Sequence, residues 1–309
     1  MTPPTLPSIS VVTPSFNQGR FLTETMESIH AQRYPYLEHI VIDGGSSDES
    51  VSVIKRYEGQ LAYWVSEPDQ GQTDALIKGF ARSTGDIQCW LNSDDLFEPG
   101  TLAEVGAYFA GNPEVDFVYG NSTWIDERGL VIKPKREHGF SRFIWMYDHN
   151  FIPQPSAFWR RELYERVGGL DPRFDLAMDA DLWIRFADVT KPRHVPRPWS
   201  RMRFYGEQKN TRLRDKSSLE GKAIRSRYLH PKSRREVAAK AAAARSLRVL
   251  WKLASGAYSA SEVLLHARTL VGGKSWEQQR LARATANVSG PSGVVADVET
   301  ESSGDESAP

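Results

Sequence analysis

Residues 86–100 read DIQCWLNSDDLFEPG. The segment 86–92 is mostly apolar and predicts a buried strand. Two adjacent carboxylates, Asp94 and Asp95, follow where that strand should end. Neighbouring like charges cost free energy unless a cation or a proton lies between them. Helix capping is an alternative role for Asp94, because a helical pattern begins near Glu98.

Strands and helices alternate around this stretch throughout the first 120 residues. The predicted strands span residues 9–13, 37–43, 61–67, 86–92 and 115–120. The predicted helices lie around 21–29 and over 47–57, 73–83 and 98–109, with Ser47 as an N-cap of the second and Pro99 in the first turn of the last. This alternation predicts an α/β fold with a parallel sheet covered on both faces.

Polar residues follow each of the first four predicted strands, and ligands bind beyond the carboxyl ends of such strands. The four polar stretches are TPSFN (13–17), DGGSSD (43–48), EPDQGQTD (67–74) and NSDD (92–95). This edge is acidic, so it would bind a phosphate through a cation, and carboxylates suit Mg²⁺ or Mn²⁺. The first turn is neither a Gly-x-Gly-x-x-Gly turn nor a Walker loop, which disfavours dinucleotide oxidoreductases and P-loop nucleotidases.

Composition narrows the class further. The formal net charge is zero, so nothing points to a nucleic-acid partner, although residues 201–252 hold 16 Lys and Arg against four Asp and Glu. The single cysteine, Cys89, has apolar neighbours and is interpreted as a core residue in a reducing compartment. The N-terminus lacks a signal-peptide pattern, and no run has the roughly 18 apolar residues of a membrane span. A cytoplasmic protein is expected.

Several ordered motifs resemble glycosyltransferase family 2. They are the stretches 10–50 and 67–95, which resemble its nucleotide-sugar-binding half, and 155–186, which resembles its acceptor half. The resemblance implies the GT-A fold, a Rossmann-like, mostly parallel sheet flanked by helices. It covers residues 8–210, divided near 120. Basic helices are expected over 211–284 and a disordered acidic tail over 285–309.

The resemblance also implies roles for individual residues. Asp43 would bind the nucleobase, Asp94 would face the ribose or sugar, and Asp95 would hold Mn²⁺ or Mg²⁺ on the diphosphate. The remaining nucleotide-sugar contacts are expected from Thr13, Pro14, Asn17, Gln70, Gly71 and Asp74.

The general base is expected in LAMDADLWIRF (176–186), where Met178 stands at a position that is often Glu in the family. Asp179 matches the catalytic Asp, and Asp181 is the second candidate. Capping of the helix is the alternative role for both residues. A second departure lies in RMRFYGEQKN (201–210), where Tyr205 replaces the family's His. The candidates for hydrogen bonding to a phosphate are then Tyr205, Arg203 and Lys209.

The implied activity is inverting transfer of a sugar from a nucleoside-diphosphate sugar to a carbohydrate or lipid-linked acceptor, in cell-surface polysaccharide or glycolipid synthesis. A nucleotidyltransferase is one alternative, but that class typically begins with a glycine-rich basic loop, which this sequence lacks. An inactive nucleotide-sugar-binding protein is the other, and it would not need Asp43, Asp95 and Asp179 together. The basic helices are expected to pack on the domain, to self-associate, or to contact the inner face of the membrane peripherally, and a solvated charged face is the plainer interpretation.

Overall fold

The computed structural model describes residues 6–229 and 233–257. Its strands are β1 Ile9–Ser15, β2 Leu37–Asp43, β3 Tyr63–Ser66, β4 Ile87–Trp90, β5 Leu96–Phe97, β6 Phe117–Ile125, β7 Val131–Lys135, β8 Ala157–Arg160 and β9 Arg193–Arg203. Its α-helices are α1 Gly19–His30, α2 Ser50–Tyr57, α3 Gln72–Arg82, α4 Thr101–Gly111, α5 Arg142–Tyr147, α6 Arg161–Arg166, α7 Met178–Val189, α8 Lys209–Arg212, α9 Arg214–Ser226 and α10 Arg234–Ala254.

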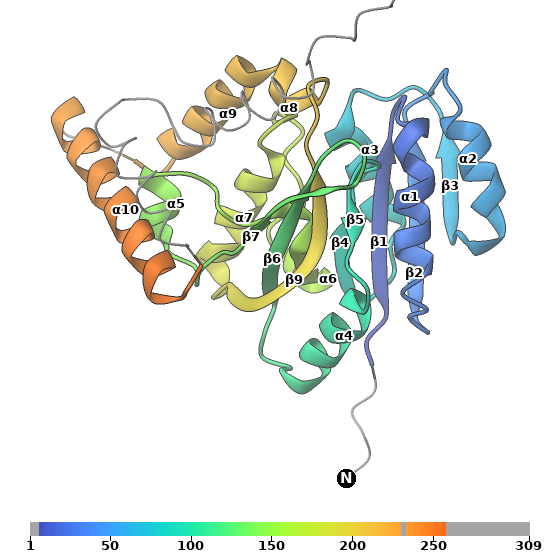
Figure 1. Cartoon of the computed structure of the whole chain (residues 1–309), viewed down its shortest axis with the longest axis horizontal. Coiled ribbons are helices and arrows are strands. Elements are labelled where there is room, and N and C mark those ends of the chain that lie inside the picture. Colours follow the sequence, from blue (N-terminus) through green and yellow to red (C-terminus); the bar gives the residue numbers. More distant parts are fainter. Residues whose placement is uncertain (1–5, 230–232, 258–309) are drawn as a thin grey trace, which may run out of the picture. The chain divides into compact units, whose positions relative to one another are not determined.

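One sheet joins these strands in the order β3-β2-β1-β4-β8-β6-β9-β5, with β7 paired to β6 (Figure 1). The first four strands are parallel, as predicted, and their register places Ser15 beside Asp43 and Asp43 beside Ser66. The polar stretches after β1, β2 and β3 therefore begin at one edge. Beyond β4 the sheet becomes mixed, because β8 runs antiparallel to both β4 and β6.

Helices pack on both faces of the parallel strands. The side chains of Leu22 and Met26 from α1 join Val41 of β2 and the α2 residues Val53 and Ile54 in one hydrophobic cluster. Helix α3 lies on the opposite face, where a Cβ at Gly79 would be 2.3 Å from Val12 Cγ1. Glycine therefore allows α3 to approach β1 closely.

An aromatic cluster joins α7 to the sheet. The ring of Trp183 stacks on Trp90 and on Phe117, with centroids 5.5 and 4.9 Å apart. Trp159 is also fully buried beside them. These rings form part of the hydrophobic core. Large buried aromatic surfaces fix the N-terminus of α7 relative to β4.

Two local predictions differ from the structure, and one short strand was not predicted. Helix α2 begins at Ser50 with Glu49 as its N-cap residue, so Ser47 is not the cap; the Asp48 carboxylate accepts from the Ser50 amide instead. Helix α4 begins at Thr101, after the left-handed Gly100, so Pro99 precedes its first turn. The short strand β5 lies in the loop after Asp95, where pairing with β9 rather than local pattern creates it.

Helix α10 packs on the domain beside α5 (Figure 1). Lys252 forms an ion pair with the buried Glu137 at 2.8 Å, and Arg248 pairs with Asp148. In the part of the chain that is described, no helix is both long enough and apolar enough to span a membrane. The acidic tail predicted over 285–309 lies outside the described residues.

Candidate active site

The acidic pair lies in the loop after β4. Trp90 pairs with Val12, so this loop leaves the sheet beside the end of β1. Asp95 is only 5% exposed, and burial together with the adjacent Asp94 holds its pKa well above the usual range. Burial also raises the pKa of Asp94. The pair is therefore an electrostatically unfavourable arrangement that a cation would relieve.

Arg203, at the end of β9, fixes the acidic loop. Its backbone N–H donates to Asp95 Oδ1 at 3.0 Å, and its Nε donates to the carbonyl oxygen of Asp94 at 2.9 Å. The buried guanidinium also donates to Glu24 and to the carbonyl oxygen of Glu127. These donors are thus used within the protein, which gives Arg203 a structural role. Lys209 is likewise paired with Asp175 at 2.6 Å.

Tyr205 occupies the position where the resemblance leads us to expect a histidine. Its hydroxyl donates to Asp94 Oδ2 at 2.9 Å and accepts from Gln18 Nε2 at 3.1 Å. Burial and the neighbouring Asp94 raise the pKa of Tyr205, so the phenol stays protonated near neutral pH. Tyr205 therefore orients Asp94 by hydrogen bonding.

The predicted nucleotide-binding residues divide into two groups. Asp43 is fully buried and accepts from Ser46 and from Ser66, while Thr13 bonds to His39 at 3.0 Å. Pro14 is buried within β1. These three residues form the inner end of the edge, and their side chains face the interior.

The second group lies at the surface of the same edge. Asn17 is exposed at φ +50°, and its Oδ1 accepts from the Ser47 amide. Gln70 is exposed, and its backbone N–H donates to Asp74 Oδ2 at 3.1 Å. Gly71 has φ +113°, a conformation that favours glycine, at the start of α3. Asn17 and Gln70 are the side chains of this set most open to a ligand.

Asp179 lies in the first turn of α7. Burial raises its pKa to about 6, although Asn150 Nδ2 donates to its Oδ2 at 2.9 Å. It lines a cavity of about 240 Å³ together with residues of α9. The buried Glu220 carboxylate of α9 accepts from the amides of residues 175, 176 and 177 and so fixes the loop that leads into α7.

Asp181, the other base candidate, is fully buried. One carboxylate oxygen accepts from Arg185 Nε at 2.8 Å, and the other accepts from Arg227 at 2.6 Å. Both oxygens are therefore held by arginines from α7 and from the end of α9. These contacts give Asp181 a structural role, whereas Asp179 lines a cavity.

Asp181→Asn should destabilise the fold. A neutral amide leaves two arginines without their carboxylate, and breaking a buried ion pair costs about 3–5 kcal/mol; the partial exposure of both arginines places the expected loss near the lower limit. Urea denaturation should report it. Arg173→Ala, which removes an exposed arginine paired with Asp171, is the matched control and should change stability little. Equal stability of Asp181→Asn and wild type would contradict the structural role.

A short segment connects Asp179 to the acidic loop. Asn150 contacts Asp179, and four residues later Gln154 Oε1 accepts from Asn92 Nδ2 at 3.0 Å. The Cα atoms of residues 150 and 154 are at most about 14 Å apart, so one short segment connects Asp179 with the loop after β4. Thr73 also donates to the carbonyl oxygen of Phe174, which joins α3 to the loop before α7. Sequence reasoning gave Asn150 and Gln154 no role, since no local pattern marks them.

The acidic loop suits a particular kind of metal site. Within residues 6–229 and 233–257, no three His, Cys, Asp or Glu side chains are grouped to hold a metal ion. Asp94 and Asp95 would supply only part of a coordination shell. Mg²⁺ and Mn²⁺ commonly take one or two carboxylates and complete their shell with substrate phosphates and water. The donor set present fits such an ion.

The fold and site define an α/β protein with an acidic loop after β4 and a further carboxylate, Asp179, that lines a cavity at the start of α7. The family model described as glycosyl transferase family 2 matches residues 10–168. An uncharacterized glycosyltransferase of Mycobacterium tuberculosis is 35% identical over 188 residues, which cover 60% of this chain and 71% of that protein. A PGL/p-HBAD biosynthesis glycosyltransferase of Mycobacterium bovis is 29% identical, covering 61% and 75%.

Solved structures agree on the fold. Staphylococcus aureus TarS 1–349 in complex with UDP-GlcNAc has a TM-score of 0.58 at 15% identity, covering 89% of this chain and 78% of that one. The mannosyltransferase PcManGT from Pyrobaculum calidifontis, in complex with GDP-Man and Mn²⁺, has a TM-score of 0.56 at 20% identity, covering 92% and 85%. The chain belongs to glycosyltransferase family 2. The predicted GT-A fold and glycosyltransferase class are confirmed, and the nucleotidyltransferase alternative is set aside.

Proposed function

We propose that this glycosyltransferase moves a sugar from a nucleoside-diphosphate sugar to an acceptor hydroxyl with inversion of the anomeric carbon, and that Asp179 is the general base. One observation carries the proposal. A half-buried carboxylate with a raised pKa opens into a cavity, and the segment 150–154 connects it to the acidic loop. Acceptor activation and leaving-group binding would thus occur at one edge.

The proposed base has suitable chemistry. With a pKa of about 6, Asp179 is mostly ionised at pH 7, yet it is a stronger proton acceptor than an ordinary aspartate. Asn150 donates to one carboxylate oxygen, and backbone amides of residues 179 and 180 also donate to the carboxylate. As the acceptor oxygen bonds to the anomeric carbon, its proton passes to Asp179 and the bond to the diphosphate breaks. Attack from the face opposite the leaving group inverts that carbon.

The acidic loop would bind the leaving group. Asp95, with Asp94 beside it, would hold Mn²⁺ or Mg²⁺, and such an ion supplies positive charge to the departing diphosphate as a Lewis acid. Arg203 fixes the backbone of both residues, and Tyr205 orients the Asp94 carboxylate toward the edge. These contacts keep the acidic pair in place before the substrate arrives, which lowers the cost of binding.

The comparisons support the donor class. Two structural neighbours are complexes with UDP-GlcNAc and with GDP-Man, so a nucleoside-diphosphate sugar is the donor that we propose here. We propose a carbohydrate or lipid-linked acceptor, in cell-surface polysaccharide or glycolipid synthesis. The test is incubation with UDP-Glc, UDP-GlcNAc, GDP-Man and dTDP-rhamnose plus Mn²⁺ and a carbohydrate acceptor, with nucleoside diphosphate release followed by chromatography. Release from one donor, and a product of inverted configuration by NMR, is expected; a retained configuration would refute the mechanism.

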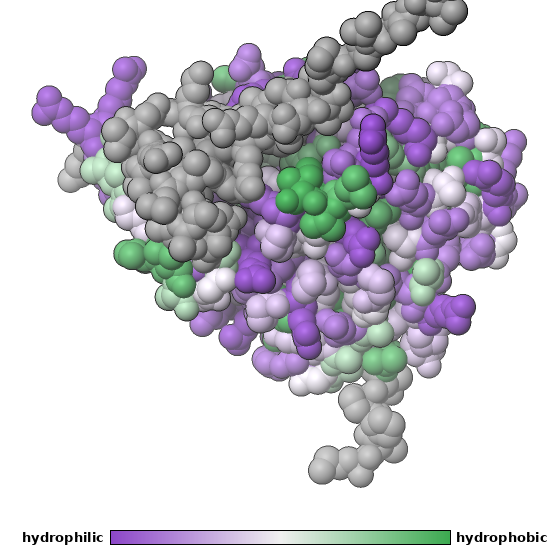
Figure 2. All heavy atoms as spheres, viewed as in Figure 1, coloured by the Kyte–Doolittle hydropathy of each residue, from purple (hydrophilic) through white to green (hydrophobic). Residues whose placement is uncertain are grey.

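The predicted membrane contact depends on α10, where Leu250 is 63% exposed and Leu247 and Leu253 are also exposed. Hydrophobic spheres lie over this part of α10 in Figure 2, whereas most of the face is hydrophilic. An amphipathic basic helix binds anionic surfaces through such residues. We expect the full chain to float with vesicles of 30% phosphatidylserine and Leu247→Ser/Leu250→Ser to float at least about threefold less. Equal flotation of the two proteins would exclude this helix as the contact.

A further inference from the structure

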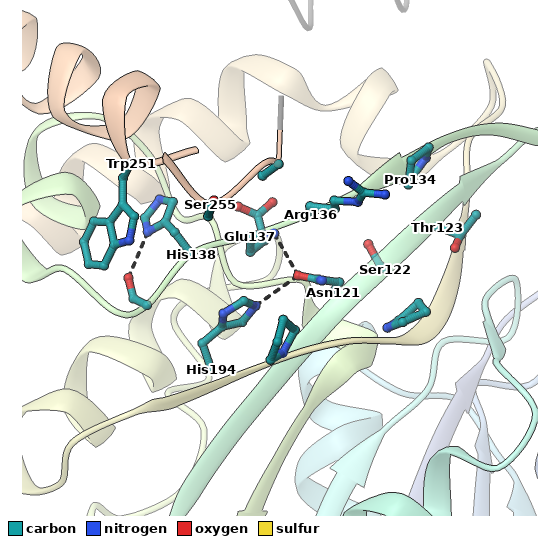
Figure 3. Close-up of a pocket in the computed structure, with 14 residues that line it drawn as sticks. Asn121, Ser122, Thr123, Pro134, Arg136, Glu137, His138, His194, Trp251 and Ser255 are labelled. Atoms are coloured by element: carbon teal, nitrogen blue, oxygen red, sulfur yellow. Dashed lines mark hydrogen bonds between the residues drawn. The ribbon is translucent and has the colours of Figure 1, made fainter. Parts of the chain in front are cut away.

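A second cavity, of about 670 Å³, lies away from the acidic loop. It is formed by β6, by β7 and the segment that follows it, by β9 and by the C-terminal end of α10 (Figure 3). None of the residues given a role in transfer lines it. Its size falls within the range of small-molecule sites. We call it the α10 pocket.

Helix α10 forms a fixed wall of the α10 pocket. Trp251 stacks on His138, with ring centroids 4.9 Å apart and planes at 25°. Lys252, the residue after Trp251, forms an ion pair with the buried Glu137 and so holds α10 against the segment that follows β7. Trp251 is still 36% exposed, so part of its ring remains available to a ligand. The pocket is therefore formed before any ligand binds.

The lining carries little free charge. Burial alone would raise the pKa of Glu137, but Lys252 and Lys135 lower it to about 2, so its negative charge is balanced within the protein. Burial lowers the pKa of His138 and of His194 to about 4, which leaves both imidazoles neutral at pH 7. Arg136 is the cation of the lining. A phosphate is not the expected ligand, because proteins usually bind phosphate with several hydrogen-bond donors and positive charges, and this lining offers one arginine.

The lining instead combines flat apolar rings with planar polar groups. The apolar rings belong to three prolines and Trp251. Asn121 accepts from His194 at 3.0 Å and from the Glu137 amide at 2.8 Å, as Figure 3 shows. The Nε2 atom of the buried His138 has no hydrogen-bond partner among the described residues. Such a surface suits a neutral ligand that has both an apolar face and hydroxyl groups.

We propose that the α10 pocket is a second, non-catalytic carbohydrate site, which binds a short neutral segment of a glycan. A sugar ring presents C–H groups on one face and hydroxyls at its edge, which matches these walls. Phe151 packs on His138 at 4.4 Å, and the preceding residue, Asn150, reaches Asp179. A buried aromatic layer thus separates the α10 pocket from the base, so the bound segment would be remote from the reacting hydroxyl.

The test is isothermal titration of the full-length protein with maltotetraose, cellotetraose, α-1,6-mannotetraose and chitotetraose, without nucleotide. We expect at least one to bind. Trp251→Ala should weaken that binding about fivefold, the equivalent of a typical aromatic contact. Ser255→Trp, which places a bulky ring at an exposed position of the lining, should abolish binding without removing a buried group. Leu250→Ala changes an exposed α10 residue outside the lining and should bind as wild type does.

Three outcomes would overturn the proposal. They are no binding by any of the four oligosaccharides, unchanged binding by both Trp251→Ala and Ser255→Trp, and loss of binding in Asp179→Asn, which would place the glycan in the active site. Thermal stabilisation by UDP and GDP with Mn²⁺ should be the same in wild type and Ser255→Trp. This readout separates failure of the α10 pocket from failure of the proposed transfer function.

Discussion

Asp179→Asn should lower kcat by about 100- to 10,000-fold and leave the protein folded, because general base catalysis contributes about that factor. The wild-type rate should rise with pH through about 6, since Asp179 must be ionised to accept a proton. The residual rate of the variant should lose this dependence. Rates measured from pH 4.5 to 8 with saturating donor would test both statements.

Although Asp179→Asn should lower activity, it should raise the stability of the folded protein at pH 7. Burial raises the pKa of Asp179 from about 4 to about 6, so the folded protein disfavours the charged form. The resulting penalty is absent below pH 4, develops between pH 4 and 6, and is complete above pH 6. Asp179→Asn should therefore have a higher Tm than wild type at pH 7 and an equal Tm at pH 4. Asp215→Asn, an exposed change on α9, is the matched control.

Full activity of Asp179→Asn would contradict its role as the base. Loss of activity together with a lower Tm at pH 7 would instead assign Asp179 a structural role like that of Asp181.

Asp95→Asn should remove the metal-dependent stabilisation by nucleotide. A ligand at a hundredfold excess over its Kd stabilises the native state by about 2.7 kcal/mol. In wild type we expect that gain with UDP or GDP in the presence of Mn²⁺, and little gain without the metal. The variant keeps an oxygen that can accept from the Arg203 amide but loses the charge that would hold the cation. Differential scanning fluorimetry of both proteins, with and without Mn²⁺, would measure the difference.

The unliganded stability of Asp95→Asn should equal or exceed that of wild type at pH 7. Burial and Asp94 hold the pKa of Asp95 well above the usual range, so its charge is unfavourable in the folded protein. Asp215→Asn again serves as the control and should keep the full nucleotide response. An undiminished Mn²⁺-dependent shift in Asp95→Asn would refute the assignment of Asp95 to the metal.

Local pattern predicted much of the nucleotide half. Strand β2 agrees with its predicted bounds, 37–43. Each end of α3 lies within one residue of the predicted bounds of that helix, 73–83. These elements are short, apolar and separated by turn residues, so their signal is local. The mixed half of the sheet was less predictable, because β5 forms only by pairing with β9, about a hundred residues later in the chain.

The partners of the site residues could not be read from the sequence. Arg203 donates to Glu24, 179 residues away, and Glu220 fixes the amides of a loop more than 40 residues earlier. Neither residue lies in a motif that distinguishes a structural clamp from a phosphate ligand. The same limit applies to Asp181, whose first-turn position resembles that of Asp179.

The sequence by itself determined the family, the alternation of strands and helices, and the acidic loop after β4, because each depends on residues close together in the chain. Only the tertiary structure distinguishes the surroundings of the two first-turn carboxylates of α7. Asp179 and Asp181 are two residues apart on one helix, yet one faces a cavity and the other is held between two arginines. Burial and distant charges set the pKa of a carboxylate, and only the folded chain brings them together.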